Sequence, residues 1–158
     1  MAAIGDVDEA NSAIGLALNA VAGEEVRAML GRIQNEMFDL GADLATPGES
    51  FEPDEMTLRI VAAQVARLEA EIDSMNTQLE PLTSFILPGG GKAAAHVHLA
   101  RTIARRAERS VVTAAAEVPL NPLARAYLNR LSVHLFVLGR LLAKDEGGDL
   151  LWQPGATR

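Results

Sequence analysis

The chain has 158 residues, and 14 lysines and arginines against 21 aspartates and glutamates give it a net charge of −7. This length suits one domain with a sizeable core, and the acidic balance argues against a nucleic-acid binder. No apolar run approaches the roughly 18 residues of a membrane span, and no secretory signal is recognisable. With no cysteine, disulfides and thiolate sites are excluded, and we expect a cytoplasmic protein.

A composition that is 49% hydrophobic but only 4% aromatic favours helices over a β-sandwich or barrel. The first predicted helix spans residues 6–22, with Asp6 and Glu9 as a variant capping box and Gly23 as a stop. The second spans 24–44 and carries an apolar stripe from Val26 to Leu44.

The third predicted helix covers residues 58–79, where apolar side chains recur every three or four positions: Leu58, Val61, Val65, Leu68, Ile72, Met75 and Leu79. A repeat of 3.5 residues predicts packing at a shallow angle.

Residues 80–92 form a loop, and a fourth helix spans 93–117. The fifth begins with Asn121 as N-cap and Pro122 in its first turn, and the tail after Gly147 and Gly148 is expected to be loose. The predicted fold is all-α: one antiparallel five-helix bundle forming a single domain over residues 1–158.

The fourth helix carries the strongest functional signal. Arg101, Arg105 and Glu108 fall within an arc of about 60°, whereas Arg106 and Arg109 lie on other faces. Two guanidinium groups one turn apart repel each other unless an anion lies between them, and their donor forks suit phosphate oxygens. A polyphosphate is therefore one predicted ligand. The alternatives are a solvated charged face or salt bridges to neighbouring helices.

Two polar residues of the first helix form a second candidate. Asn11 interrupts an apolar stripe, and Asp8 lies one turn before it, where it could pair with an arginine of the fourth helix. The other interpretation is that Asp8 merely favours the dipole at the helix start.

The loop from Ser84 to Gly91 places three apolar residues beside proline and three glycines. The glycines allow close approach to a ligand, and Phe85 could present its ring to an apolar face. Alternatively, residues 85–87 plug the end of the bundle. The segment lacks the spacing of a Walker loop.

On the fifth helix, the mixed face of Asn129, Ser132, Phe136 and Arg140 suggests either a site wall or ordinary surface. His96 and His98 point about 200° apart on a helix, so we expect no metal site there. His134 is expected at the helix surface or an interface.

Several motifs together resemble the PduO-type ATP:cob(I)alamin adenosyltransferases. They follow the family order over nearly the whole chain: residues 5–12, 32–34, 41–44, 84–90, 98–101, 105–109 and 127–132. The resemblance implies a homotrimer with sites between subunits. It also implies transfer of the 5′-deoxyadenosyl group from ATP to reduced cobalamin, with Mg²⁺ assisting and triphosphate leaving. A reductase and an adenosylcobalamin-dependent enzyme would be further partners.

By matching position, the residues lining the ATP site would be Arg101, Arg105, Glu108, Asn129 and, with a less defined role, Arg106. The resemblance also implies that Asp8 braces Arg101 across the subunit boundary, and that Phe85 faces the corrin and displaces the lower ligand of cobalt. Asn11, like Asp8, is expected among the cofactor-binding residues. Because cob(I)alamin is itself the nucleophile, the protein needs no nucleophilic side chain.

The sequence departs from the family in three places. We expect the N-terminal loop that wraps ATP phosphates to be missing before the first helix, and Val133 and His134 replace the frequent Asp and Tyr. The alternative function is therefore a non-catalytic helical bundle that binds cobalamin or serves as a scaffold.

Overall fold

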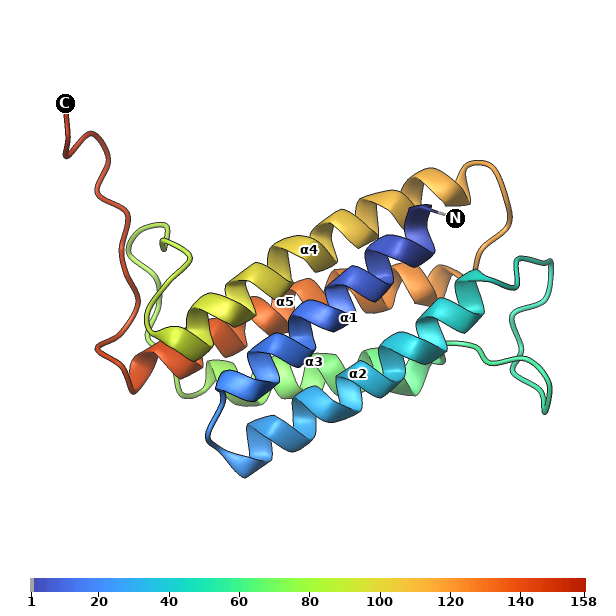
Figure 1. The fold of residues 1–158 in the computed structure, drawn as a ribbon, viewed down its shortest axis with the longest axis horizontal. Helices are drawn as coiled ribbons and strands as arrows, with labels where there is room; N and C mark the ends of the chain where they lie inside the picture. The colour runs from blue at the N-terminus through green and yellow to red at the C-terminus, as the bar shows by residue number, and fades with distance from the viewer. Residues whose placement is uncertain (1) are drawn as a thin grey trace.

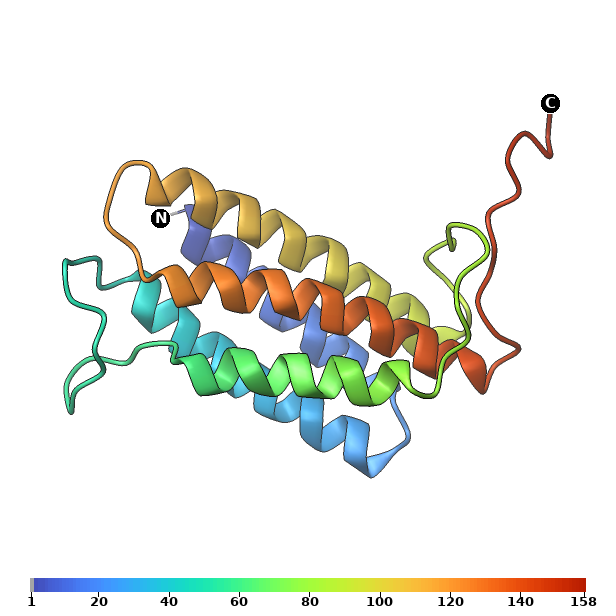
Figure 2. The same cartoon turned by 180° about the vertical axis from the view of Figure 1, so that it is seen from behind.

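The computed structural model describes residues 2–158, which form the predicted antiparallel bundle (Figures 1 and 2). Its helices, in chain order, are α1 (Ala2–Ala20), α2 (Glu24–Leu44), α3 (Ala62–Asn76), α4 (Lys92–Ala115) and α5 (Pro122–Lys144). Apart from one isolated bridge between Ile86 and Leu151, the described residues contain no β pairing. None of the helices within 2–158 is long and apolar enough to cross a membrane.

Helix α4 packs against both α1 and α5. The α1 and α4 faces are built largely from small buried residues, including Ala10 and Ala17 on α1 and Ala100 and Ala104 on α4. Small side chains let the two backbones approach closely. The buried leucine stripe of α5 fills the remaining interior: Leu128, Leu131, Leu135 and Leu138.

The start of α1 differs from the prediction. The helix already includes Ala2, so Asp6 is a helical residue and not the N-cap. Its carboxylate instead accepts a hydrogen bond from Ser110 of α4 and lies 3.5 Å from the guanidinium of Arg106, which also pairs with Glu9. The two carboxylates hold α1 against α4, and the predicted capping box was wrong.

Helix α3 is shorter than its apolar repeat predicted. It begins after Val61, so Leu58 lies in the preceding loop and is exposed. The reason is a distant contact: buried Asp43 of α2 accepts hydrogen bonds from Arg59 at 2.8 Å and from the backbone N–H of Ile60 at 2.8 Å. Asn121 donates to the same carboxylate at 2.7 Å. The hydrogen bonds from residues 59 and 60 to Asp43 hold these two residues outside the helix, so α3 begins only after Val61.

The N-cap of α5 is confirmed. The side chain of Asn121 accepts a hydrogen bond from the backbone N–H of Leu123 at 3.0 Å, and Pro122 occupies the first turn. Asn121 therefore serves both the helix start and the Asp43 cluster, which joins the ends of α2 and α5.

A second polar cluster crosses α2, α3 and α5. Glu71 of α3 accepts hydrogen bonds from Arg32 and from the ring of His134, each at 2.9 Å. His134 is fully buried, so the predicted surface position was wrong. Nearby, the hydroxyl of Tyr127 donates to the buried Glu36 at 2.7 Å.

The electrostatics of Glu71 predict a pH-dependent stability. Burial acts to raise the pKa of Glu71, but hydrogen bonds from His134 and Arg32 outweigh it and lower that pKa from 4.5 to about 2. The folded state therefore binds this proton more weakly than the unfolded chain. The carboxylate stabilises the fold above pH 4.5, and this contribution is lost as the pH falls toward 2.

We predict that Glu71→Gln flattens the loss of unfolding free energy with acid between pH 4.5 and 2. The measurement is urea unfolding of both proteins across that range. Glu69→Gln, on an exposed position of the same helix, is the control and should follow the wild type. Parallel curves for wild type and Glu71→Gln would contradict the prediction.

Candidate active site

One face of α4, together with α5 and the loop before α4, forms the candidate site. A pocket of about 610 Å³ is lined by Phe85, His98, Arg101 and Phe136 among others. Arg101 is half-buried, and its guanidinium carbon lies 5.9 Å from the centroid of the Phe136 ring. The pocket thus combines apolar walls with one cation, which suits a ligand that is largely apolar and carries anionic groups nearby.

His98 forms the inner wall of this pocket. The ring is 1% exposed and fits against Gly139 of α5, where an added Cβ would come within 2.7 Å of it. Burial and the charge of Arg101 lower the pKa of His98, so the ring is neutral at neutral pH. Sequence reasoning did not single out this role. The one signal in the sequence is Gly139, a glycine within the leucine-rich α5. The apolar pattern of the helices does not show that Gly139 contacts His98.

Arg105 lies one turn beyond Arg101 and is exposed outside the pocket. Burial, followed by the charge of Arg105, lowers the pKa of Arg101. The two guanidinium groups therefore do share one region of α4, as the sequence predicted. An anion lying against both would relieve their repulsion.

The same face continues to Glu108 and Asn129, which meet across α4 and α5. The amide of Asn129 donates to the Glu108 carboxylate at 2.8 Å. Both residues line a polar recess of about 500 Å³ with Val112 and Arg125. A strip of α4 therefore runs from Arg101, which shares the pocket with Phe85, through Arg105 to Glu108, which shares the recess with Asn129. Phe136 and Asn129 of α5 each line one of these two cavities.

Arg106 is not on this strip. It points to α1, where it pairs with Asp6 and Glu9. The salt-bridge alternative left open for the arginine cluster therefore holds for Arg106. The geometry gives it a bracing position and not a place beside Arg101.

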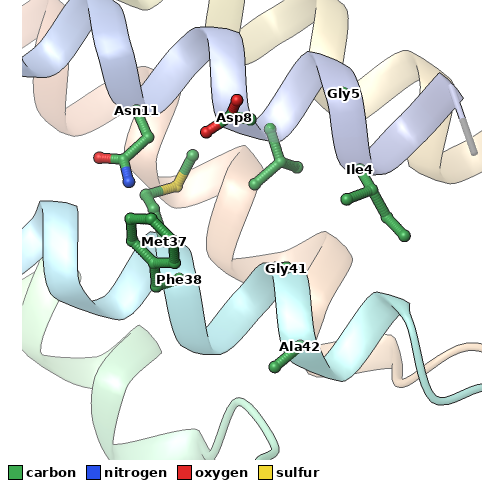
Figure 3. A pocket seen from close by; sticks show the side chains of 9 residues that line it. Ile4, Gly5, Asp8, Asn11, Met37, Phe38, Gly41 and Ala42 are labelled. Carbon is green, nitrogen blue, oxygen red and sulfur yellow. The ribbon is translucent and has the colours of Figure 1, made fainter.

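Asp8 and Asn11 line a different pocket, of about 430 Å³, between α1 and α2 (Figure 3). Asn11 donates through its amide to the carbonyl of Gln34 at 3.1 Å, and Gln34 returns a hydrogen bond to the Asn11 carbonyl at 3.2 Å. The Oδ1 atom of Asn11 is buried and has no hydrogen-bond partner in the described part of the chain. Met37 and Phe38 face these residues from α2 (Figure 3).

The chain by itself does not join this pocket to the strip on α4. Asp8 is exposed and forms no ion pair within residues 2–158, and Phe38 beside it is 71% exposed. An exposed carboxylate and an exposed aromatic ring at one pocket leave polar and apolar contacts open to another molecule.

The loop before α4 does not plug the bundle. Phe85 is 78% exposed and Leu87 is 47% exposed, so the plugging alternative was wrong for both residues. Gly90 and Gly91 have φ angles of +88° and +101°, which side chains rarely tolerate, and they turn the chain into α4. This turn leaves the ring of Phe85 at the rim of the large pocket.

Comparisons with known proteins agree with this geometry. The sequence profile of the family described as cobalamin adenosyltransferase matches residues 1–142. A cobalamin adenosyltransferase of Cupriavidus metallidurans is 48% identical over 96% of this chain and 79% of its own length. A corrinoid adenosyltransferase of Mycobacterium leprae is 45% identical over 98% of this chain and 83% of its own.

A solved structure shows the same fold with ligands. A variant PduO-type ATP:corrinoid adenosyltransferase from Lactobacillus reuteri, complexed with cobalamin and ATP, superposes with a TM-score of 0.85 at 34% identity. That alignment covers 96% of this chain and 84% of the other. On this evidence, the chain belongs to the cobalamin adenosyltransferase family.

Proposed function

We propose that this protein transfers the 5′-deoxyadenosyl group of ATP to cob(I)alamin, giving adenosylcobalamin and triphosphate. The observation that carries the proposal is the strip on α4, where a half-buried Arg101 borders the large pocket and Arg105 follows on the next turn. The names of the relatives and the ligands of the solved neighbour point to the same reaction.

The residues of the strip divide the work by their chemistry. Cob(I)alamin is the nucleophile, so cobalt attacks C5′ of ATP while the bond from C5′ to the triphosphate oxygen breaks. Arg101 and Arg105 would stabilise the negative charge that develops on the leaving triphosphate. Glu108 and Asn129 form a hydrogen-bonded pair that would line the nucleotide side of the site.

Phe85 stands at the rim of the 610 Å³ pocket, where it would face the corrin. An apolar ring below the macrocycle offers cobalt no electron pair. It would displace the lower ligand, and loss of that ligand makes reduction to Co(I) easier. The exposed position of the ring supports this role, because a ring buried in the bundle could not reach a substrate.

The site is proposed to be completed by a second subunit in a homotrimer. In one chain Arg101 has a buried Nε without a hydrogen-bond partner among the described residues, and Asp8 on α1 is exposed. If α1 of one subunit lies along α4 of the next, Asp8 can brace Arg101 while the exposed Phe38 is covered. Asn11 would stand beside this junction.

Mg²⁺ is proposed to arrive with ATP. Within residues 2–158, no group of three or more His, Asp or Glu side chains could hold a metal ion. Mg²⁺ commonly binds substrate phosphates while keeping several waters. Arg106 is proposed to act indirectly, by holding α1 to α4. A partner reductase, a recipient enzyme and a cytoplasmic location remain predictions.

The reaction is tested by an anaerobic assay with ATP, Mg²⁺ and chemically reduced cobalamin, in which formation of the Co–C bond is followed by absorbance. We predict that the wild type forms adenosylcobalamin and that Arg105→Ala lowers the rate by roughly 100-fold or more, a loss typical for a donor that stabilises developing charge. Arg105→Lys keeps the charge but not the planar fork, so its rate should lie between those of the wild type and Arg105→Ala.

Arg109→Ala removes another exposed arginine of α4 that borders none of the pockets described, and it should leave the rate unchanged. Wild-type activity in Arg105→Ala would refute the role of that guanidinium. Absence of product with the wild-type protein would refute the reaction and favour a non-catalytic bundle.

A further inference from the structure

The segment after α5 runs back along the loop that carries Phe85 (Figure 1). Leu87 donates its backbone N–H to the carbonyl of Leu150 at 2.7 Å, and Trp152 donates its own to the carbonyl of Phe85 at 2.8 Å. The hydroxyl of Ser84 donates to the carbonyl of Trp152 at 2.9 Å. This pairing was not expected from the sequence, which predicted a loose tail.

The side chains of the two segments also meet. The rings of Phe85 and Trp152 lie edge to face, with centroids 6.1 Å apart and planes at 65°. This arrangement is the favoured one for aromatic pairs. Trp152 does not line the 610 Å³ pocket, whereas Phe85 does, so Trp152 touches the ring from outside the pocket.

A side chain of α5 anchors both segments. Arg140 donates through Nε to the carboxylate of Asp149 at 2.9 Å and through Nη2 to the carbonyl of Glu80 at 2.8 Å. One guanidinium thus fixes the start of the tail and the start of the loop. The loop also leaves room for the tail at Gly89, where a Cβ would lie 2.9 Å from the side chain of Leu150.

We propose that residues 149–152 form a strap that sets the position of Phe85, with Trp152 as a positioning residue for its ring. The inference rests on the proposed function, because it concerns the residue assigned to the lower face of the corrin. Without the strap, a ring that is 78% exposed on a glycine-rich loop would have many orientations open to it. The strap selects the one at the pocket rim, so that the ring is in place before cobalamin binds.

The test compares Trp152→Ala and Trp152→Phe with the wild type. For each protein, cob(II)alamin is added with ATP, and electron paramagnetic resonance gives the fraction of cobalt that has lost its lower ligand. We expect Trp152→Ala to lower the equilibrium ratio of ligand-free to ligand-bound cobalt by about two- to tenfold, the range that one aromatic pair supports. Trp152→Phe should restore most of it.

Two kinetic comparisons separate positioning from general damage. Trp152→Ala should slow turnover that starts from cob(II)alamin and a reductant more than turnover from pre-reduced cob(I)alamin, with the Kd for ATP unchanged. Leu151→Ala is the matched control, since it shortens a side chain of the same strap and keeps the ring pair. It should behave as the wild type in both assays.

Trp152 is the sole tryptophan, so its fluorescence reports on the strap without any substrate. Phe85→Ala should expose the ring of Trp152, so acrylamide should quench its fluorescence more strongly than in the wild type. Equal quenching in the wild type and Phe85→Ala would overturn the ring contact.

An unchanged cobalt signal in Trp152→Ala, or equal losses in Trp152→Ala and Leu151→Ala, would overturn the positioning role. If the wild type forms no adenosylcobalamin, the proposed function fails, and the strap proposal fails with it. If the wild type turns over but Trp152 has no effect, only the strap proposal fails.

Discussion

Repulsion between two guanidinium groups one turn apart on α4 is the constraint on which the rest of the site depends. Arg101 is half-buried, so its charge is only partly hydrated, and Arg105 beside it adds to the cost. Such a pair is best stabilised by negative charge placed against both forks. In the proposed reaction, the leaving triphosphate supplies that charge. The repulsion between the two guanidinium groups in the free protein is therefore relieved when the charged product forms.

The surrounding bundle keeps these forks in place. Arg106 pairs with two carboxylates of α1, and small alanines let α1 and α4 approach closely. On the opposite flank, α5 presents Phe136 below Arg101 and Asn129 beside Glu108. The protein therefore supplies cations and shape, while the reactivity belongs to the reduced cobalt.

Local signals were enough to predict much of the fold. Helix periodicity located all five helices, and the dipeptide at Asn121 and Pro122 marked the start of α5 correctly because capping involves only neighbouring residues. The spacing of Arg101, Arg105 and Glu108 also placed them on one face, since helical geometry fixes it. Their meeting with Asn129 followed from the family resemblance and not from spacing.

Three of the wrong predictions share one physical cause, which is contact between residues far apart in sequence. Asp43 binds residues 59 and 60, so α3 begins later in the chain than its apolar repeat predicts. Glu71 forms a hydrogen bond with His134, which lies in the interior. The pairing of the tail with the loop before α4 likewise depends on backbone hydrogen bonds that no periodicity reveals. Each of these contacts joins segments whose proximity exists only in the folded bundle.

In the proposed homotrimer the site would be shared, with Arg101 from one subunit and the bracing carboxylate of Asp8 from another. Asp8→Ala and Arg101→Ala proteins can be tested alone and after assembly into mixed oligomers. Each pure variant is predicted to be impaired, whereas mixed oligomers contain some interfaces with both native side chains and should regain activity. Mixed oligomers no more active than the pure variants would contradict a site shared between subunits.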